Sequence, residues 1–134
     1  MASISKIEGI GPVFTEKLAE AGIKTTEKLL EKGATRKGRG EIAKETGIDE
    51  KRVLRWVNMA DLFRIKGVGE EYSDLLEAAG VDTVKELRNR NAENLHKKCE
   101  EVNEEKNLVR QTPSLNQITD FIAQAKELEP VITY

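Results

Sequence analysis

The chain has 134 residues, of which 38% are hydrophobic, 4% aromatic and 34% charged, with a net charge of −2. This length suits one compact domain or two packed halves, and the aliphatic composition is typical of short amphipathic helices. No apolar run approaches the roughly 20 residues that span a bilayer, and the first residues lack the apolar stretch of a signal peptide. A single cysteine, Cys99, cannot form an internal disulfide. We therefore expect a helical cytoplasmic protein with no membrane partner.

The charge is distributed unevenly along the chain. Residues 1–64 contain 13 Lys and Arg and 10 Asp and Glu, a net charge of +3, whereas residues 65–134 contain 9 and 14, a net charge of −5. An acidic chain does not coat nucleic acid along its whole surface. Any binding site for a polyanion is therefore expected in the first half.

A glycine turn near the start of the chain recurs 58 positions later. Residues 7–11 read Ile-Glu-Gly-Ile-Gly, and residues 65–69 read Ile-Lys-Gly-Val-Gly. The match continues at the same spacing through Phe14 and Tyr72, Leu18 and Leu76, Ala21-Gly22-Ile23 and Ala79-Gly80-Val81, Thr25 and Thr83, and Leu29 and Leu87. Because small, apolar and turn residues all coincide, the sequence predicts two tandem structural units, residues 1–64 and 65–134.

Each unit is predicted to consist of the glycine turn followed by helices. The two glycines permit a tight turn, and the apolar residue between them points inward. The first helix ends at Gly22 or Gly80, and Thr25 or Thr83 caps the next. Further helices are expected near 35–46 and 50–63 in the first unit, and near 92–102 and 114–128 in the second. The second unit is longer by about seven residues, 65 − 58, which are expected in a polar loop near 103–112.

At these residues the chain resembles the helix-hairpin-helix superfamily, through Ile-x-Gly-Ile-Gly, a later Leu, and Ala-Gly-Ile-x-Thr. Almost the whole sequence is similar to a bacterial family of tandem hairpin units that is known as a domain of unknown function. The resemblance implies an all-α fold with two tandem helix-hairpin-helix-like units packed into one compact helical body.

The resemblance also implies a phosphate site at a hairpin. In DNA-binding members of the superfamily, the hairpin amides and the following helix N-terminus face a phosphate, often beside a monovalent cation held by hairpin carbonyls. Free amides and the positive end of a helix favour anions. By position, the site would involve Gly9, Ile10 and Gly11, or alternatively Gly67, Val68 and Gly69.

The two hairpins differ in the residues that follow them. Pro12, Val13 and Phe14 leave the mouth of the first hairpin uncharged, whereas Glu70 and Glu71 follow the second. Carboxylates at a helix N-terminus interact with the helix dipole and repel phosphate. We therefore expect DNA at the first hairpin and a structural role for the second.

Basic residues after the first hairpin form a further candidate interface. Ala43, Gly47, Val53 and Trp56 have the spacing of a helix-turn-helix, in which Lys51, Arg52 and Arg55 would face DNA. Two packed helices with a solvated face are the favoured alternative, with Trp56 buried. The densest basic patch contains Arg36, Lys37 and Arg39, with Lys44 nearby. These basic residues either contact DNA phosphates or simply form part of the charged, solvent-exposed surface.

No pattern in the sequence indicates catalysis. His96 and Cys99 are three residues apart, but no second Cys or His pair completes a zinc site, and Cys99 is expected to be a core residue between Leu95 and Val102. We expect a non-enzymatic module that binds the backbone of double-stranded DNA without sequence specificity. It has no small-molecule substrate, no metal, and no cofactor beyond the hairpin cation. A protein-interaction adaptor with the same helical scaffold is the alternative.

Overall fold

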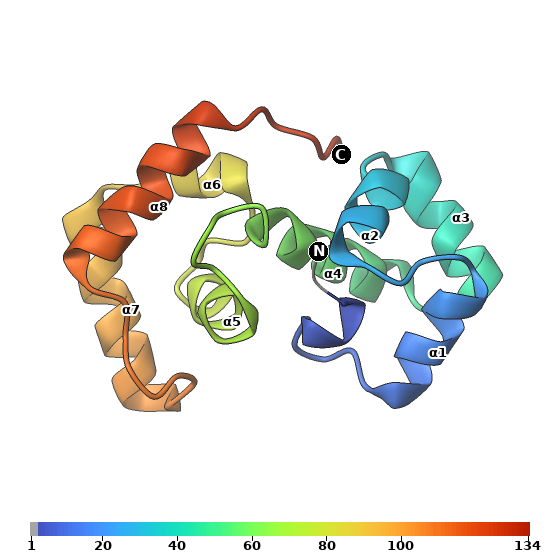
Figure 1. Ribbon diagram of the computed structural model, residues 1–134, viewed down its shortest axis with the longest axis horizontal. Helices are drawn as coiled ribbons and strands as arrows, with labels where there is room; N and C mark the ends of the chain where they lie inside the picture. Colours follow the sequence, from blue (N-terminus) through green and yellow to red (C-terminus); the bar gives the residue numbers. More distant parts are fainter. Residues whose placement is uncertain (1–2) are drawn as a thin grey trace. The chain divides into compact units, whose positions relative to one another are not determined.

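The computed structural model describes residues 3–134, which form eight α-helices and a short 3-10 helix and contain no β-strand (Figure 1). The predicted all-α fold class is confirmed. In chain order the elements are the 3-10 helix Ile4–Lys6, α1 (Pro12–Glu20), α2 (Thr26–Gly33), α3 (Arg36–Thr46), α4 (Glu50–Leu62), α5 (Glu70–Ala78), α6 (Val84–Arg88), α7 (Ala92–Lys106) and α8 (Leu115–Glu127). None of the helices in residues 3–134 combines the length and apolar character needed to span a bilayer.

The chain divides into two compact units. The first comprises the residues up to Asp61 together with the tail Val131–Tyr134, and the second comprises Leu62–Pro130. The division predicted from the repeat lay between residues 64 and 65, and it assigned the tail to the second unit. In the structure the first unit is built on α1 to α4 and the second on α5 to α8, so each has four helices in the same order (Figure 1).

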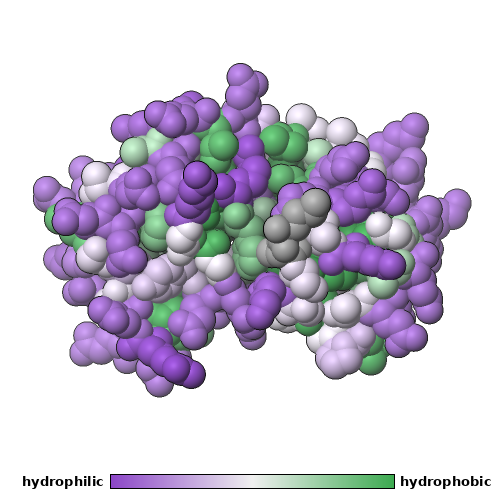
Figure 2. Space-filling view, viewed as in Figure 1, coloured by the Kyte–Doolittle hydropathy of each residue, from purple (hydrophilic) through white to green (hydrophobic). Residues whose placement is uncertain are grey.

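Polar side chains at the helix starts explain where most helices begin. At the start of five helices a side-chain oxygen of the N-cap residue accepts a hydrogen bond from a first-turn amide. The N-cap residues of α2, α3, α6, α7 and α8 are, respectively, Thr25, Thr35, Thr83, Asn91 and Ser114. Such caps satisfy amides that have no partner within the helix. The outer helix faces are charged, and the face shown in Figure 2 is mostly hydrophilic with small hydrophobic patches.

In both units a glycine with a left-handed backbone conformation follows the end of the first helix. Gly22 and Gly80 have φ angles of 82° and 96°, in the left-handed region that glycine adopts without strain. A cation then reaches back to each helix end: Lys32 Nζ donates to the Ala21 carbonyl at 3.1 Å, and Arg90 Nη2 donates to the Gly80 carbonyl at 2.8 Å. Lys32 and Arg90 are also 58 positions apart, so the two donors correspond in the repeat, although the acceptor carbonyls differ by one position.

An aromatic pair lies beneath each glycine turn. Phe14 and Trp56 have ring centroids 5.2 Å apart, and Tyr72 and Phe121 have centroids 6.2 Å apart, with nearly equal tilts of 57° and 56°. Trp56 is 2% exposed, which confirms its predicted burial. Because Trp56 and Phe121 come from α4 and α8, the last helix of each unit packs against the turn that opens it.

The additional residues of the second unit are divided between a longer helix and a loop. The polar loop was predicted near 103–112, but α7 continues to Lys106 and ends at Asn107, whose φ is 51°. The Asn103 side chain donates to the Val109 carbonyl at 3.1 Å and accepts from the Val109 amide at 2.9 Å. This pair of bonds allows α7 to end and the loop to turn immediately toward α8.

Candidate nucleic-acid interface

The first hairpin is a tight turn that requires glycine at one position. Gly9 has a φ of 94°, and a Cβ added there would lie 3.0 Å from Arg55 Nη1. Ile10 is 6% exposed, and its amide donates to the Ile7 carbonyl at 3.2 Å. The prediction that the central apolar residue points inward is confirmed.

The helix that follows the first hairpin begins without a side-chain cap. Gly11 is the N-cap of α1 and supplies no side-chain hydrogen bond, and Pro12 has no amide hydrogen. Val13, the next residue, is 64% exposed. The remaining first-turn amides have no partner within the helix. The start of α1 therefore presents hydrogen-bond donors at an uncharged surface.

Two arginines from α4 supply positive charge beside this helix start. The Arg52 guanidinium lies 5.3 Å from the centroid of the Phe14 ring, and Arg55 Nη1 donates to the Glu8 carbonyl at 3.3 Å. Cation–π and hydrogen-bonding contacts of this kind orient long side chains that would otherwise be mobile. The structure thus joins the first hairpin to two of the predicted basic residues. The Glu8 side chain is exposed in the same turn.

The other predicted basic residues lie on different parts of the first unit. Arg36 and Lys51 line a groove between α3, α4 and the C-terminal tail. Lys37 lines a hollow that also contains Lys32, Glu41 and Glu45, so its surroundings have mixed charge. Lys44 is exposed in the last turn of α3. Arg36 and Lys37, although adjacent in the predicted patch, therefore line different hollows.

Arg39 is a core residue of the first unit. It is 5% exposed, and its guanidinium donates to three carbonyls: Gly33 at 2.9 Å, Ala34 at 3.2 Å and Thr133 at 2.7 Å. It therefore satisfies the end of α2 and fixes the tail. Because Arg39 is buried and its guanidinium bonds three carbonyls inside the protein, it does not belong to the exposed interface that was predicted to include it.

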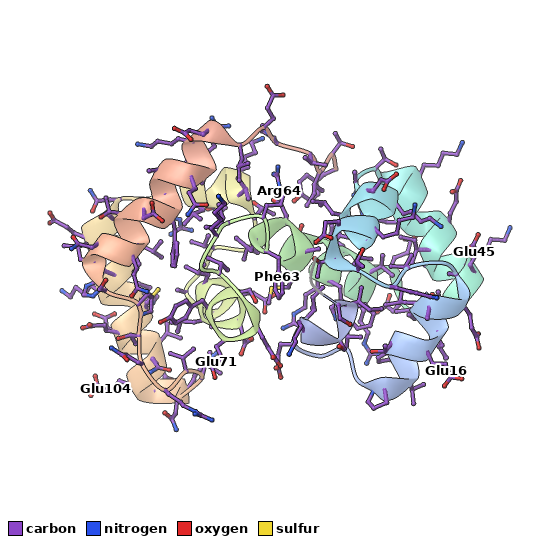
Figure 3. The ribbon with its side chains drawn as sticks, in the orientation of Figure 1. Glu16, Glu45, Phe63, Arg64, Glu71 and Glu104 are labelled. Atoms are coloured by element: carbon purple, nitrogen blue, oxygen red, sulfur yellow. The ribbon has the colours of Figure 1, made fainter. Side chains whose placement is uncertain are left out.

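The second hairpin repeats the turn but not its electrostatics. Gly67 has a φ of 97°, Val68 is 5% exposed and Gly69 begins α5 without a side-chain cap. Two exposed carboxylates, Glu70 and Glu71, occupy the first turn of α5, and Figure 3 labels the second of them. These charges already interact with the helix dipole, which disfavours a phosphate there.

The backbone of the second turn is also bonded to α8. Gln124 accepts from the Lys66 amide at 2.9 Å and donates to the Lys66 carbonyl at 3.1 Å. The side-chain Nε2 of Gln124 also donates to Asp120 Oδ2 at 2.9 Å. These bonds connect the second turn to α8.

Within residues 3–134 no group of three or more His, Cys, Asp or Glu side chains is placed to hold a metal ion. Cys99 is fully buried, as predicted, and burial followed by the charge of Glu100 raises the pKa of its thiol to about 11. His96 Nε2 lies 3.3 Å from Glu100 Oε1.

The fold and the two turns define a small all-α protein made of two glycine-turn units, in which Arg52 and Arg55 lie beside the first turn and Glu70 and Glu71 follow the second. The model of the family described as a domain of unknown function (DUF4332) matches residues 8–128, and the chain belongs to this family. Neither the curated proteins nor the solved structures include a match. The matched region contains both hairpins and both α4 arginines.

Proposed function

We propose that this protein is a non-enzymatic helix-hairpin-helix module whose first hairpin binds DNA phosphates. The observation that carries the proposal is the position of Arg52 and Arg55 beside the uncapped start of α1. A phosphate there accepts hydrogen bonds from first-turn amides while the guanidinium groups neutralise its charge. Backbone amides alone give a weak anion site, and the two arginines strengthen it.

The same geometry supports binding that does not depend on base sequence. The residues at the mouth of the hairpin are Pro12, Val13 and Phe14, which carry no polar side chain to read a base edge. Amides and arginines that face phosphates determine position and affinity but carry no sequence information. Double-stranded DNA of any sequence is therefore the proposed partner.

The hairpin carbonyls are poorly suited to the monovalent cation that the superfamily resemblance implies. The Glu8 carbonyl already accepts from Arg55, and the Lys66 carbonyl accepts from Gln124. A guanidinium beside the first turn also repels a second positive charge. In this proposal Arg55 supplies the positive charge at the first hairpin. No metal ion is needed for DNA to bind there.

A protein-interaction adaptor is the second candidate function. The observation that favours it is the acidic turn of the second unit, where Glu70 and Glu71 are exposed. A basic protein surface is the partner that such a turn would attract.

A salt-dependent DNA titration distinguishes the two functions. We expect a short labelled duplex to bind more weakly as salt rises, and Arg52→Gln or Arg55→Gln each to reduce the slope of log affinity against log salt by about 1. Lys97→Gln, at an exposed lysine on α7, is the matched control and leaves the slope unchanged. An absence of binding at micromolar protein and low salt rejects the DNA proposal and favours the adaptor.

A further inference from the structure

A second cationic feature lies in the first unit, apart from the hairpin. Helices α3 and α4 and the tail Val131–Tyr134 border a groove of about 260 Å³. Its lining residues are Arg36, Arg39, Glu50, Lys51, Leu54 and Tyr134. Its exposed charged groups are Arg36, Lys51 and Glu50, with a net charge of +1, while Arg39 is buried and bonded to carbonyls. The groove therefore favours an anionic ligand.

An aromatic ring is held at the edge of the groove by contacts on several sides. The Tyr134 hydroxyl donates to Asn58 Oδ1 at 3.1 Å, and the Arg39 guanidinium lies 5.6 Å from the ring centroid. The preceding residue, Thr133, donates its amide to the Ala34 carbonyl at 2.8 Å and accepts from Arg39 at 2.7 Å. The tail is therefore tied to the end of α2 by a backbone hydrogen bond and to α3 by the Arg39 side chain.

Despite these contacts, Tyr134 is 66% exposed. An exposed aromatic ring that the protein already orients is the usual platform on which an unpaired base stacks. The half-buried Leu54 extends the apolar surface beside it.

The charged residues of the groove are placed to bind a phosphate next to that base. Arg36 is the first residue of α3, and Lys51 lies in the first turn of α4; both are exposed. Lys51 precedes Arg52, which lies beside the first hairpin, so α4 contributes cations to both features. Glu50 offers an acceptor for the amino group of a base.

We propose that this groove binds one unpaired nucleotide of a nucleic-acid strand, with its base on Tyr134 and its phosphate between Arg36 and Lys51. The inference deepens the proposed function and rests on it for the class of partner. It adds a structural preference: DNA that has a single-stranded extension binds more tightly than a blunt duplex.

Fluorescence anisotropy with the full chain tests the groove on three probes: a blunt duplex, the same duplex with a single-stranded pyrimidine extension, and the extension alone. One stacked base contributes about fivefold or more in affinity, and we expect at least this gain from the extension. Tyr134→Leu removes the gain, and Tyr134→Phe, which keeps the ring and loses the bond to Asn58, retains it. Circular dichroism verifies that both variants are folded.

The outcomes separate the groove from the hairpin. Lys51→Gln reduces the gain from the extension, whereas Arg52→Gln weakens binding of blunt and extended duplexes by the same factor. An extended duplex that binds no tighter than the blunt one, or a gain that survives Tyr134→Leu, overturns the groove proposal and leaves the hairpin proposal intact. Tyr134-dependent binding of the single strand without any duplex binding supports the groove and rejects the hairpin site.

Discussion

Arg55 and Asp120 occupy the same place in the two units, with opposite charge. They are 65 residues apart, and each precedes the aromatic residue that lies against the turn glycine: an added Cβ at Gly9 would be 3.6 Å from Trp56, and one at Gly67 would be 3.0 Å from Phe121. Arg55 donates to the Glu8 carbonyl of the first turn, whereas Asp120 accepts from Gln124, which bonds the Lys66 backbone in the second turn. This reversal is the physical reason to expect one DNA site and not two.

Binding at the first hairpin should not depend on which monovalent cation is present. Arg55 already donates to the Glu8 carbonyl, so we expect equal DNA affinity in potassium, sodium and tetramethylammonium chloride at matched ionic strength. Isothermal titration calorimetry or anisotropy measures this directly. An affinity that appears only in potassium would show that the turn carbonyls bind the ion.

Gly9 and Gly11 should respond differently to alanine. Gly9→Ala places a side chain at a φ of 94°, and we expect it to lower the free energy of unfolding by about 1–2 kcal/mol. Gly11 has a φ of −86° with no atom within 4 Å of an added Cβ, so Gly11→Ala should change that free energy by less than about 0.5 kcal/mol. Urea unfolding followed by the fluorescence of Trp56 reports on the first unit, and equal losses would contradict the assigned turn.

Arg39 and Arg36 form a matched pair one helical turn apart. Arg39→Gln removes charged donors from three carbonyls inside the first unit, and we expect it to cost about 2–3 kcal/mol of unfolding free energy. Arg36→Gln alters an exposed side chain and should cost less than about 0.5 kcal/mol. Thermal unfolding monitored by circular dichroism compares them, and an Arg39 variant as stable as the Arg36 variant would refute the structural role.

Cys99 should be unreactive in the folded protein. Its pKa is raised to about 11 from an ordinary value of 9.0, chiefly by burial, so little thiolate is present near pH 8. The folded chain prefers the protonated thiol, so the stability this preference contributes is present below pH 9 and is lost as the pH rises through about 11. Labelling with a disulfide reagent at pH 8 should be slow in buffer and complete in urea. Rapid labelling of the native chain would contradict the burial.

Local features of the fold were predictable because a few neighbouring residues determine them. Gly22 and Gly80 end helices through their own backbone angles, and Thr25 and Thr83 cap the next helices through bonds three residues away. The buried side of each turn follows from its central apolar residue. These features recur at a constant spacing, so the repeat could be recognised from the sequence.

Long-range contacts were not predictable by the same reasoning. Arg39 was grouped with Arg36 as a surface patch, because the Thr133 carbonyl that it binds lies 94 residues away. A comparison at the spacing of 65 would have paired Arg52 with Gln117 and Arg55 with Asp120. The difference in charge at these paired positions was present in the sequence. Only the contacts of Arg52 and Arg55 in the structure show that the positions lie beside the first turn.

The most direct test of the single-site account is a titration of the ¹⁵N-labelled protein with a short blunt duplex, followed by NMR. We predict that the amide signals of Gly9, Gly11, Val13 and Phe14 shift as DNA is added, while those of Gly67 and residues 69–72 do not. The Arg52→Gln variant should reduce the shifts at the first hairpin without moving the others. Shifts at the second hairpin of equal size, or none at the first, would contradict the account.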